Sequence, residues 1–216
     1  MIIHYLKYTE QLNFDDIERY TAFVSEERQK KIAGASDPKV KTESLLTGLF
    51  LRMLLAEHLK VPADTFSFTK NTYGRPALDG HPELFFSVSQ KKGLICIGLH
   101  DGDLGIDTEA VCARKPSVAR RSFTPAEQKA MQNAEDPDEM FYEIWTRKES
   151  YVKFLGTGFH GVAPDAVDVF ALEHRAACRF CSQRIDDHLI TVCTDRNAPP
   201  EIECIERTVK ELLDFY

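Results

Sequence analysis

Two short segments of the sequence concentrate acidic and basic side chains that could act together on one ligand. The first contains Asp107 and Glu109, and the second contains Lys148, Glu149 and Lys153. Converging carboxylates without a histidine or cysteine in the set favour a hard cation such as Mg²⁺, which prefers oxygen ligands. A lysine four residues after one of these carboxylates favours a phosphate lying against that cation. The pattern therefore indicates phosphoryl chemistry.

Asp107 and Glu109 lie two residues apart in a segment that predicts a strand. Because side chains alternate along a strand, both carboxylates should point to one face, with Cα atoms about 6.5–7 Å apart. Ile106 should then point into the core, and Gly105 permits another backbone to approach closely. The alternative for this pair is an exposed acidic pair on an edge strand.

The second segment predicts a helix on which Trp145, Glu149 and Lys153 recur every four residues, beside an apolar stripe. Two interpretations stay open. Glu149 and Lys153 could form an exposed ion pair, worth about 0.3–0.5 kcal/mol, or the carboxylate could hold a metal and the ammonium a phosphate beside it. Gly156-Thr-Gly158 ends the helix and can turn the chain back towards a ligand.

Glu127 follows Thr124 by three residues, with Pro125 at the first helical position. This is the pattern of a capping box with a proline start. The local role explains Glu127, so we assign it no part in the chemistry.

Composition sets the class of protein. The 216 residues are 43% hydrophobic and 28% charged, which is ordinary for a soluble chain of one large or two small domains. We find no apolar run of the roughly 18 residues needed to span a membrane and no secretion signal, so we expect a cytoplasmic protein without a membrane partner. The net charge of −7 argues against nucleic acid as a partner.

Six cysteines in such a protein predict thiols and not a disulfide framework. Cys178 and Cys181 form a C-x-x-C, but a second pair of zinc ligands is not evident. A redox motif would lie between a strand and the start of a helix, whereas this one lies in a predicted strand. We interpret it as structural.

Hydrophobic periodicity predicts two similar α+β lobes, over residues 1–103 and 104–216, each a small, mostly antiparallel sheet packed with helices. The predicted strands are Ile2–Tyr8, Phe66–Phe68, Leu84–Ser89, Leu94–Leu99, Leu104–Glu109, Val167–Leu172, Cys178–Ile185, Leu189–Thr194 and Ile202–Ile205. The predicted helices are Asp15–Lys31, Ser44–Leu59, Ser117–Ser122, one that opens at Thr124, Asp136–Leu155 and Val209–Phe215.

These residues resemble the 4′-phosphopantetheinyl transferases, specifically the larger monomeric type that activates surfactin synthetase and similar peptide and polyketide synthases. The resemblance covers most of the chain. The segment that begins at Gly105 and the segment that begins at Trp145 are highly specific when they occur together, about forty residues apart, and neither would be adequate alone. The matching segments are Gly105-Ile-Asp-Thr-Glu109, Gly74-Arg-Pro76, Phe86-Ser-Val-Ser-Gln90, Trp145-Thr-Arg-Lys-Glu149-Ser-Tyr-Val-Lys153, Phe123-Thr-Pro-Ala-Glu127 and Gly156-Thr-Gly158.

The resemblance implies transfer of the 4′-phosphopantetheine group from coenzyme A to a serine hydroxyl of an apo acyl, peptidyl or aryl carrier protein, releasing adenosine 3′,5′-bisphosphate. It also implies a monomer whose two lobes are related by a pseudo-twofold axis, with coenzyme A between them. The N-terminal lobe would hold the nucleotide, and the C-terminal lobe the metal and the carrier protein. The pathway that the carrier protein serves stays open.

Carried over to this sequence, the resemblance assigns a metal site, two catalytic residues and a coenzyme A site. Asp107, Glu109 and Glu149 would hold Mg²⁺, with Mn²⁺ as the alternative. Lys153 would stabilise the phosphate oxygens, and Glu149 or a metal-bound water that it positions would be the base. Coenzyme A would contact Arg28 and Lys31 at the 3′-phosphate, Arg75 and Pro76 at the adenine end, and Ser89 and Gln90 at the diphosphate.

The sequence departs from the family pattern at two positions. Gln90 stands where the family usually has histidine, and Glu43 stands where a basic residue often helps to hold the nucleotide. These departures favour one alternative, a non-catalytic relative that binds coenzyme A or carrier proteins. A metal-dependent phosphohydrolase, with water as the nucleophile, is the other.

Overall fold

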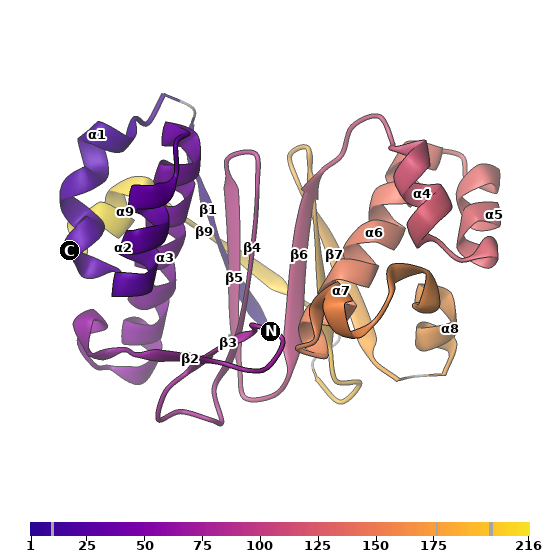
Figure 1. The fold of residues 1–216 in the computed structure, drawn as a ribbon. Coiled ribbons are helices and arrows are strands. Elements are labelled where there is room, and N and C mark those ends of the chain that lie inside the picture. The colour runs from indigo at the N-terminus through magenta and orange to yellow at the C-terminus, as the bar shows by residue number, and fades with distance from the viewer. Residues whose placement is uncertain (10, 176, 199–200) are drawn as a thin grey trace.

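The computed structural model describes residues 1–9, 11–175, 177–198 and 201–216. Two groups of helices lie on the outside of the molecule, and the strands lie between them (Figure 1). The strands form two main sheets and one small hairpin. Small, separate sheets packed against helices confirm the predicted α+β class.

The first sheet has the strand order β4-β5-β1-β9. Its central strands, β1 (Ile2–Lys7) and β5 (Leu94–His100), are antiparallel, and β4 (Phe85–Lys91) pairs with β5 as a hairpin. The two-stranded hairpin lies apart from this sheet. It consists of β2 (Phe68–Lys70) and β3 (Pro76–Leu78).

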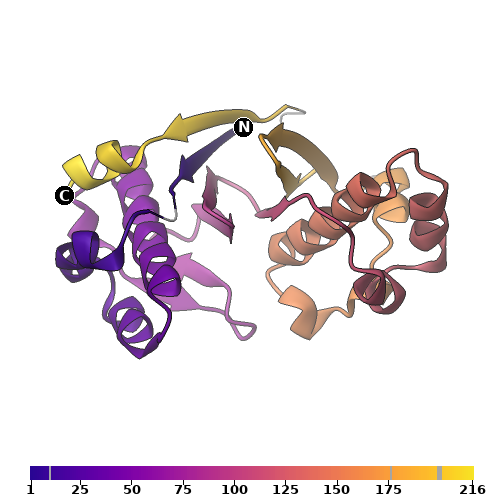
Figure 2. The same cartoon turned by 90° about the horizontal axis from the view of Figure 1, so that it is seen from above.

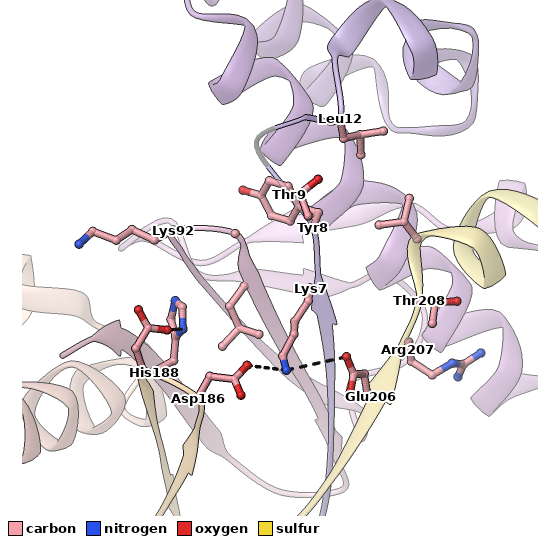
Figure 3. A pocket seen from close by; sticks show the side chains of 14 residues that line it. Lys7, Tyr8, Thr9, Leu12, Lys92, Asp186, His188, Glu206, Arg207 and Thr208 are labelled. Atoms are coloured by element: carbon pink, nitrogen blue, oxygen red, sulfur yellow. Dashed lines mark ion pairs between the residues drawn. The ribbon is translucent and has the colours of Figure 1, made fainter.

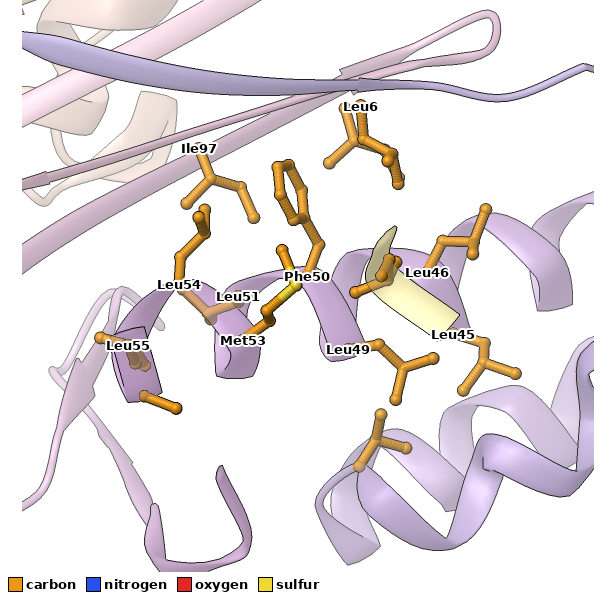
Figure 4. Packing of buried hydrophobic residues seen from close by; sticks show 14 of the residues in the cluster. Leu6, Leu45, Leu46, Leu49, Phe50, Leu51, Met53, Leu54, Leu55 and Ile97 are labelled. Carbon is orange, nitrogen blue, oxygen red and sulfur yellow. The ribbon is translucent and has the colours of Figure 1, made fainter. Parts of the chain in front are cut away.

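Helix α3 (Pro38–Leu59) forms the centre of the first core. Asp37 caps it and Pro38 opens it, and its apolar side chains are buried nearly all round the axis, as the sequence predicts for a central helix. Phe50 and its neighbours on α3 point to Leu6 and Ile97 of the sheet (Figure 4). The other helices of this group are α1 (Phe14–Ile17), a 3₁₀ turn (Glu18–Phe23) and α2 (Glu26–Gly34).

The predicted helix Asp15–Lys31 is therefore divided into three pieces. The division has a local cause at Ser25, which is extended and whose side chain accepts a hydrogen bond from the backbone N–H of Arg28. Ser25 is thus the N-cap of a new helix and not an interior residue of a long one. A short 3₁₀ segment, Ala63–Thr65, follows α3.

The second sheet is fully antiparallel, in the order β6-β8-β7. Its strands are β6 (Leu104–Ala110), β7 (Arg179–Ile185) and β8 (His188–Thr194). Helix α6 (Pro137–Phe154) packs against β6 and β8. The remaining helices on this side are α4 (Pro116–Ser122), α5 (Pro125–Asn133), α7 (Gly158–Gly161), a 3₁₀ turn (Pro164–Ala166) and α8 (Val169–His174).

The predicted strand Val167–Leu172 is wrong, because α8 occupies most of this segment. Asp168 caps the helix by accepting a hydrogen bond from the backbone N–H of Ala171 at 2.9 Å. Val167 and Val169 are buried in the second core. The alternating apolar residues therefore reflect burial at a helix start, a pattern that periodicity alone does not separate from a short strand.

The C-terminal segment lies with the first group of helices. Strand β9 (Glu203–Arg207) pairs in parallel with β1, and helix α9 (Val209–Asp214) packs beside α3 (Figures 1 and 2). Arg207 forms a bidentate ion pair with Glu57 of α3, with N–O distances of 2.9 and 2.7 Å. The division into lobes at residue 104 stays a prediction, and the chain crosses back to the first lobe after β8.

The inner faces of the two sheets share a third core. Ile3 and Cys96 of the first sheet pack with Ile106 and Val192 of the second. Ile106 is thus buried, as alternation along β6 predicts. No disulfide joins the cysteines of the described residues, and none of the described helices is both long and apolar enough to cross a membrane.

Gly105 sets how closely β6 approaches α6, and it provides the first prediction. A Cβ atom at this position would lie 1.9 Å from the carbonyl oxygen of Ser150 and 2.4 Å from the backbone nitrogen of Phe154. Backbone atoms cannot turn aside, so Gly105→Ala should lower the free energy of unfolding by about 1–3 kcal/mol or more. Urea unfolding should give a change within about 0.5 kcal/mol for the control Gly34→Ala, where a Cβ meets open space. Equal stability of the two variants would contradict the close approach.

Candidate active site

The candidate site lies where β4 and β6 run side by side, and side chains of β4 join the two strands. The Ser87 hydroxyl accepts a hydrogen bond from the backbone N–H of Ile106 at 2.9 Å. Two residues on, the Ser89 hydroxyl accepts one from the N–H of Thr108 at 3.1 Å. Serine oxygens thus satisfy backbone donors of β6, and they fix the position of this strand beside the first sheet.

Asp107 lies at the centre of this seam, with 6% of its surface exposed. Its Oδ1 accepts a hydrogen bond from Ser89 at 3.0 Å and pairs with the Lys153 ammonium at 2.7 Å. Burial raises the pKa of Asp107, and the nearby positive charge of Lys153 opposes this rise. Oδ2 is buried without a hydrogen-bond partner among the described residues. This carboxylate therefore has one oxygen left for a ligand.

Lys153 reaches across the seam from α6. Besides Asp107, its ammonium donates to the carbonyl oxygen of Ile106 at 2.9 Å and to the Ser89 hydroxyl at 3.3 Å. The exposed i, i+4 ion pair with Glu149, one of the two interpretations of this helix, is thus not the contact that Lys153 makes. Its partners belong to β4 and β6, so Lys153 helps to hold the two sheets together.

Lys91 completes the cluster, and no motif in the sequence singles it out. Its ammonium lies 2.7 Å from Oε2 of Glu109, and the side chains are 35% and 16% exposed. Alternation along β4 was the available signal, because Ser87, Ser89 and Lys91 must share one face of the strand. Alternation does not give the register between β4 and β6, so it could not identify Glu109 as the partner of Lys91.

Glu149 faces the two carboxylates of β6 from α6. Burial raises the pKa of Glu149 to about 7, and the negative charges of Asp107 and Glu109 contribute, while Lys153 and Lys91 oppose the rise. Among the described residues, Glu149 has no ion pair. The structure therefore brings the three predicted carboxylates and Lys153 to one place.

The cluster suits a hard divalent cation by its chemistry, although the side chains are not prearranged around one. Within the described ranges, no three histidine, cysteine or acidic side chains already surround a point that a metal could occupy. The reason is that Asp107 and Glu109 each hold a lysine. The oxygen donors and the unsatisfied Oδ2 of Asp107 nevertheless fit Mg²⁺.

Two adjoining hollows beside the cluster contain most of the residues predicted to bind coenzyme A. One, of about 320 Å³, is lined by Arg28, Lys31, Pro76 and Gln90. The other, of about 270 Å³, is lined by Arg75, Pro76 and Lys153. Ser89 lies in the seam instead, where it is buried against Asp107.

The two arginines among these predicted ligand contacts are already engaged within the protein. Arg28 donates to the carbonyl oxygen of Ser44 at 3.0 Å, and burial lowers the pKa of this guanidinium. Arg75 pairs with Asp103 at 2.9 Å and donates to the carbonyl oxygen of Phe154 at 3.2 Å, at the end of α6. A cation near the last carbonyls of a helix is favourable. Arg75 thus links the turn before β3 to α6.

The two departures from the family pattern bond to each other. The Gln90 amide donates to Oε1 of Glu43 at 3.0 Å and accepts from the Thr47 hydroxyl at 2.8 Å. The Tyr8 hydroxyl donates to the other oxygen of Glu43 at 2.7 Å, and burial together with this carboxylate raises the pKa of Tyr8. Glu43 is therefore turned towards Tyr8 and Gln90.

A separate cavity of about 530 Å³ lies at the tips of the hairpins (Figure 3). Lys7 lies within it between Asp186, at 2.6 Å, and Glu206, at 3.9 Å, and Lys92 also lines it. Its lining includes none of the three carboxylates of the cluster. The volume alone therefore does not mark the site of chemistry.

Comparison with known proteins decides the family. Residues 103–211 match the 4′-phosphopantetheinyl transferase superfamily, and they include Asp107, Glu109, Glu149 and Lys153. This chain belongs to the 4′-phosphopantetheinyl transferase superfamily. The predicted resemblance is confirmed, and membership identifies the protein as a transferase.

Curated relatives of the larger type support this membership. The chain is 30% identical over 139 residues to the 4′-phosphopantetheinyl transferase gsp of Aneurinibacillus migulanus, covering 63% of this chain and 58% of gsp. It is 25% identical over 204 residues to ffp of Bacillus subtilis, covering 88% and 90%. It is also 25% identical over 150 residues to Sfp of Bacillus subtilis strain 168, covering 68% and 66%. The chain thus spans less than two thirds of gsp and Sfp and most of ffp.

In this member of the superfamily, a buried ion pair supports the helix that carries Glu149. Lys148 and Glu127 are fully buried, with 2.7 Å between Nζ and Oε2. Burial lowers the pKa of Lys148, and Glu127 opposes this. Lys148 also donates to the carbonyl oxygens of Pro164, at 2.9 Å, and Val167. The predicted capping box of Glu127 is confirmed, but it explains only part of this residue's role.

Breaking this pair is the second prediction. Lys148→Met should lower the free energy of unfolding by about 3–5 kcal/mol, because it leaves the Glu127 carboxylate buried without its counter-ion. Lys148→Met combined with Glu127→Gln should recover most of the loss, since glutamine can still complete a capping box. Denaturant unfolding measures both variants. The exposed pair of Lys210 and Asp214 gives the control, because Lys210→Met should change stability by only about 0.5 kcal/mol. No recovery in the double variant would contradict the pairing.

The raised pKa of Glu149 gives a third prediction, on stability in the absence of metal. The ordinary pKa of this group is 4.5 and the folded value is about 7, so between these values the unfolded chain binds fewer protons than the folded one. Stability should therefore fall as pH rises through this window and level off above it. Urea unfolding in EDTA should show this fall in the wild type relative to Glu149→Gln. A difference that is flat, or rises with pH, would count against the assignment.

Proposed function

We propose that this protein transfers the 4′-phosphopantetheine group from coenzyme A to a serine hydroxyl of an apo acyl, peptidyl or aryl carrier protein. The other product is adenosine 3′,5′-bisphosphate. We further propose that it acts in the cytoplasm as a monomer and depends on Mg²⁺, with Mn²⁺ as the alternative. Membership of the superfamily supports the reaction class.

One observation carries the proposal: Asp107, Glu109 and Glu149 come from two separate segments and gather with Lys153 at the seam between the sheets. A cluster of carboxylates that is largely shielded from water is costly unless cations neutralise it. Mg²⁺ bound there would neutralise the diphosphate of coenzyme A and make the attacked phosphorus more electrophilic. Asp107, Glu109 and Glu149 are the residues that would hold it.

Lys153 is the residue that would meet the phosphate oxygens. Its side chain is 30% exposed and lines the hollow that also contains Arg75 and Pro76. It is held in place by Ile106 and Ser89 as well as by Asp107. A cation fixed in advance beside the reacting group stabilises charge in the transition state without reorganising then.

Glu149 is suited to take the proton from the serine hydroxyl, directly or through a water molecule that it positions. A general base works best when its pKa lies near the working pH, and the pKa of Glu149 is about 7. A carboxylate that also holds a metal is a weaker base. We therefore propose that Glu149 removes the proton either directly or through the water molecule.

The hollows beside the cluster are where we propose that coenzyme A lies. Arg28 and Lys31 line one end together with Arg52, and Lys70 also lies there, paired with Glu27. The groove continues past Pro76 and Phe86 to Lys153. This order supports a nucleotide phosphate at one end of the groove and the diphosphate at the other.

A second candidate function is a non-catalytic module that binds coenzyme A or carrier proteins. The observation that favours it is the bond between Gln90 and Glu43, which leaves that part of the groove without a cation from either residue. Such a module would keep the binding groove but would not catalyse transfer. A test that detects the transferred group separates the two candidates.

The fourth prediction tests transfer. Incubation with coenzyme A, MgCl₂ and a panel of apo acyl, peptidyl and aryl carrier proteins should add one phosphopantetheine group to at least one of them, as measured by intact-protein mass spectrometry. Glu149→Gln should reduce the rate at least about a hundredfold, because it removes a metal ligand and the base together. Glu143→Gln, earlier on the same helix, is the matched control and should keep the rate. Modification of no carrier would favour the binding module, and phosphopantetheine released without any carrier would favour a hydrolase.

A further inference from the structure

Alternation along β4 sends Gln90 and Lys91 to opposite sides of the strand. Gln90 points to α3, where both ends of its amide are engaged by Thr47 and Glu43. Lys91 points to β6, on the face that also carries Ser87 and Ser89. The residue at this end of β4 that brings a charge to the acidic cluster is therefore Lys91.

Lys91 and Lys153 occupy equivalent positions towards the two carboxylates of β6. Each ammonium lies 2.7 Å from one carboxylate oxygen, Lys153 at Asp107 and Lys91 at Glu109. The two lysines reach the strand from different directions, one from α6 and the other from the end of β4. Two of the three carboxylates thus already carry a cationic partner supplied by the protein.

The two lysines differ in how firmly they are held. Besides the ion pair with Asp107, the Lys153 ammonium donates to the Ser89 hydroxyl and to the carbonyl oxygen of Ile106. The Lys91 side chain is 35% exposed, and its one ion pair among the described residues is with Glu109. Partly exposed pairs of this kind contribute little to stability, so Lys91 can leave Glu109 at small cost.

We propose that Lys91 is a further residue of this active site, with two successive roles. In the metal-free protein its ammonium neutralises Glu109 and keeps that carboxylate in place. When Glu109 takes a divalent cation, Lys91 is released from it and binds the diphosphate of the nucleotide substrate beside the same carboxylate. The second role rests on the proposed function, and the first does not.

The two roles predict effects of opposite sign. Removing Lys91 removes a competitor and a repelling charge beside Glu109, so Mg²⁺ alone should bind more tightly. It also removes a charge-assisted hydrogen bond to phosphate, so coenzyme A should bind more weakly once Mg²⁺ is present. A salt bridge that serves only the fold would change neither affinity in this crossed way.

The fifth prediction is tested by calorimetry on full-length protein. MgCl₂ is titrated into metal-free wild type and Lys91→Met, and coenzyme A is then titrated in excess MgCl₂. We expect Lys91→Met to bind Mg²⁺ about threefold more tightly and coenzyme A about tenfold more weakly. Lys91→Arg should keep coenzyme A binding within about threefold of wild type, because it keeps the charge.

Two further variants make the result specific. Lys92→Ala is the matched control, since Lys92 is the next residue along the chain but lines the separate cavity at the hairpin tips, as Figure 3 shows. It should leave both affinities unchanged. In a Glu109→Gln background, Lys91→Met should no longer tighten Mg²⁺ binding, because its partner carboxylate is gone.

Each outcome decides one part of the proposal. Unchanged or weaker Mg²⁺ binding in Lys91→Met overturns the exchange at Glu109, and unchanged coenzyme A binding overturns the diphosphate contact. If both affinities change as expected but no carrier protein is modified by wild type, the proposed transfer fails and the role of Lys91 stands. If carriers are modified and Lys91→Met binds Mg²⁺ and coenzyme A as wild type does, the proposed transfer stands and the role of Lys91 fails.

Discussion

The arrangement of this protein depends on strand β6 being held on two sides at once. On one side Gly105 lets the backbone of α6 approach so closely that no Cβ would fit between them. On the other side the hydroxyls of Ser87 and Ser89 bind backbone N–H groups of β6. Asp107 and Glu109 therefore have fixed positions relative to α6, which carries Glu149 and Lys153. The acidic cluster is a consequence of this double contact.

The support behind the cluster has a different character from the cluster itself. Behind α6, Lys148 and Glu127 are shut away from water and surrounded by backbone partners, so that pair is strongly sensitive to the loss of one member. At the seam, the pair of Lys91 and Glu109 is partly exposed and can change partner at low cost, whereas Lys153 is held by Ser89 and Ile106 as well as by Asp107. The rigid pair of Lys148 and Glu127 supports the helix that carries Glu149, and the exchangeable pair leaves Glu109 available to a ligand.

Local features of the sequence predicted much of the fold. Hydrophobic periodicity, helix-capping residues and helix-breaking residues predict four features of the structure. These are the α+β class, the buried central helix, the capping box at Thr124 and the inward-facing Ile106. The prediction of a strand at Val167–Leu172 was wrong, because the apolar pattern around the helix N-cap at Asp168 is the same as that of a short buried strand. The return of β9 to β1 was not predictable from local pattern, because it depends on pairing between opposite ends of the chain.

The same distinction applies to the candidate site. The spacing within each segment identified Asp107, Glu109, Glu149 and Lys153 as partners for one ligand, and the structure brings them together. The pairs between segments were missed, both Lys91 with Glu109 and Lys148 with Glu127. Lys148 was recognised only as part of a motif, and Glu127 only as a cap. To predict such pairs, one must know how the elements are aligned with each other. Strand alternation and helical periodicity do not give this alignment.

The balance of charge explains how so many ionisable groups can share a partly buried site. When all are ionised, three carboxylates and two lysines leave one net negative charge at the seam. The proton that Glu149 retains up to about pH 7 removes even this excess. A divalent cation instead makes the site net positive by one charge once Glu149 ionises, which suits an anionic diphosphate. Each state is thus within one charge of neutrality, and a low-dielectric site tolerates such states far better than three unpaired carboxylates.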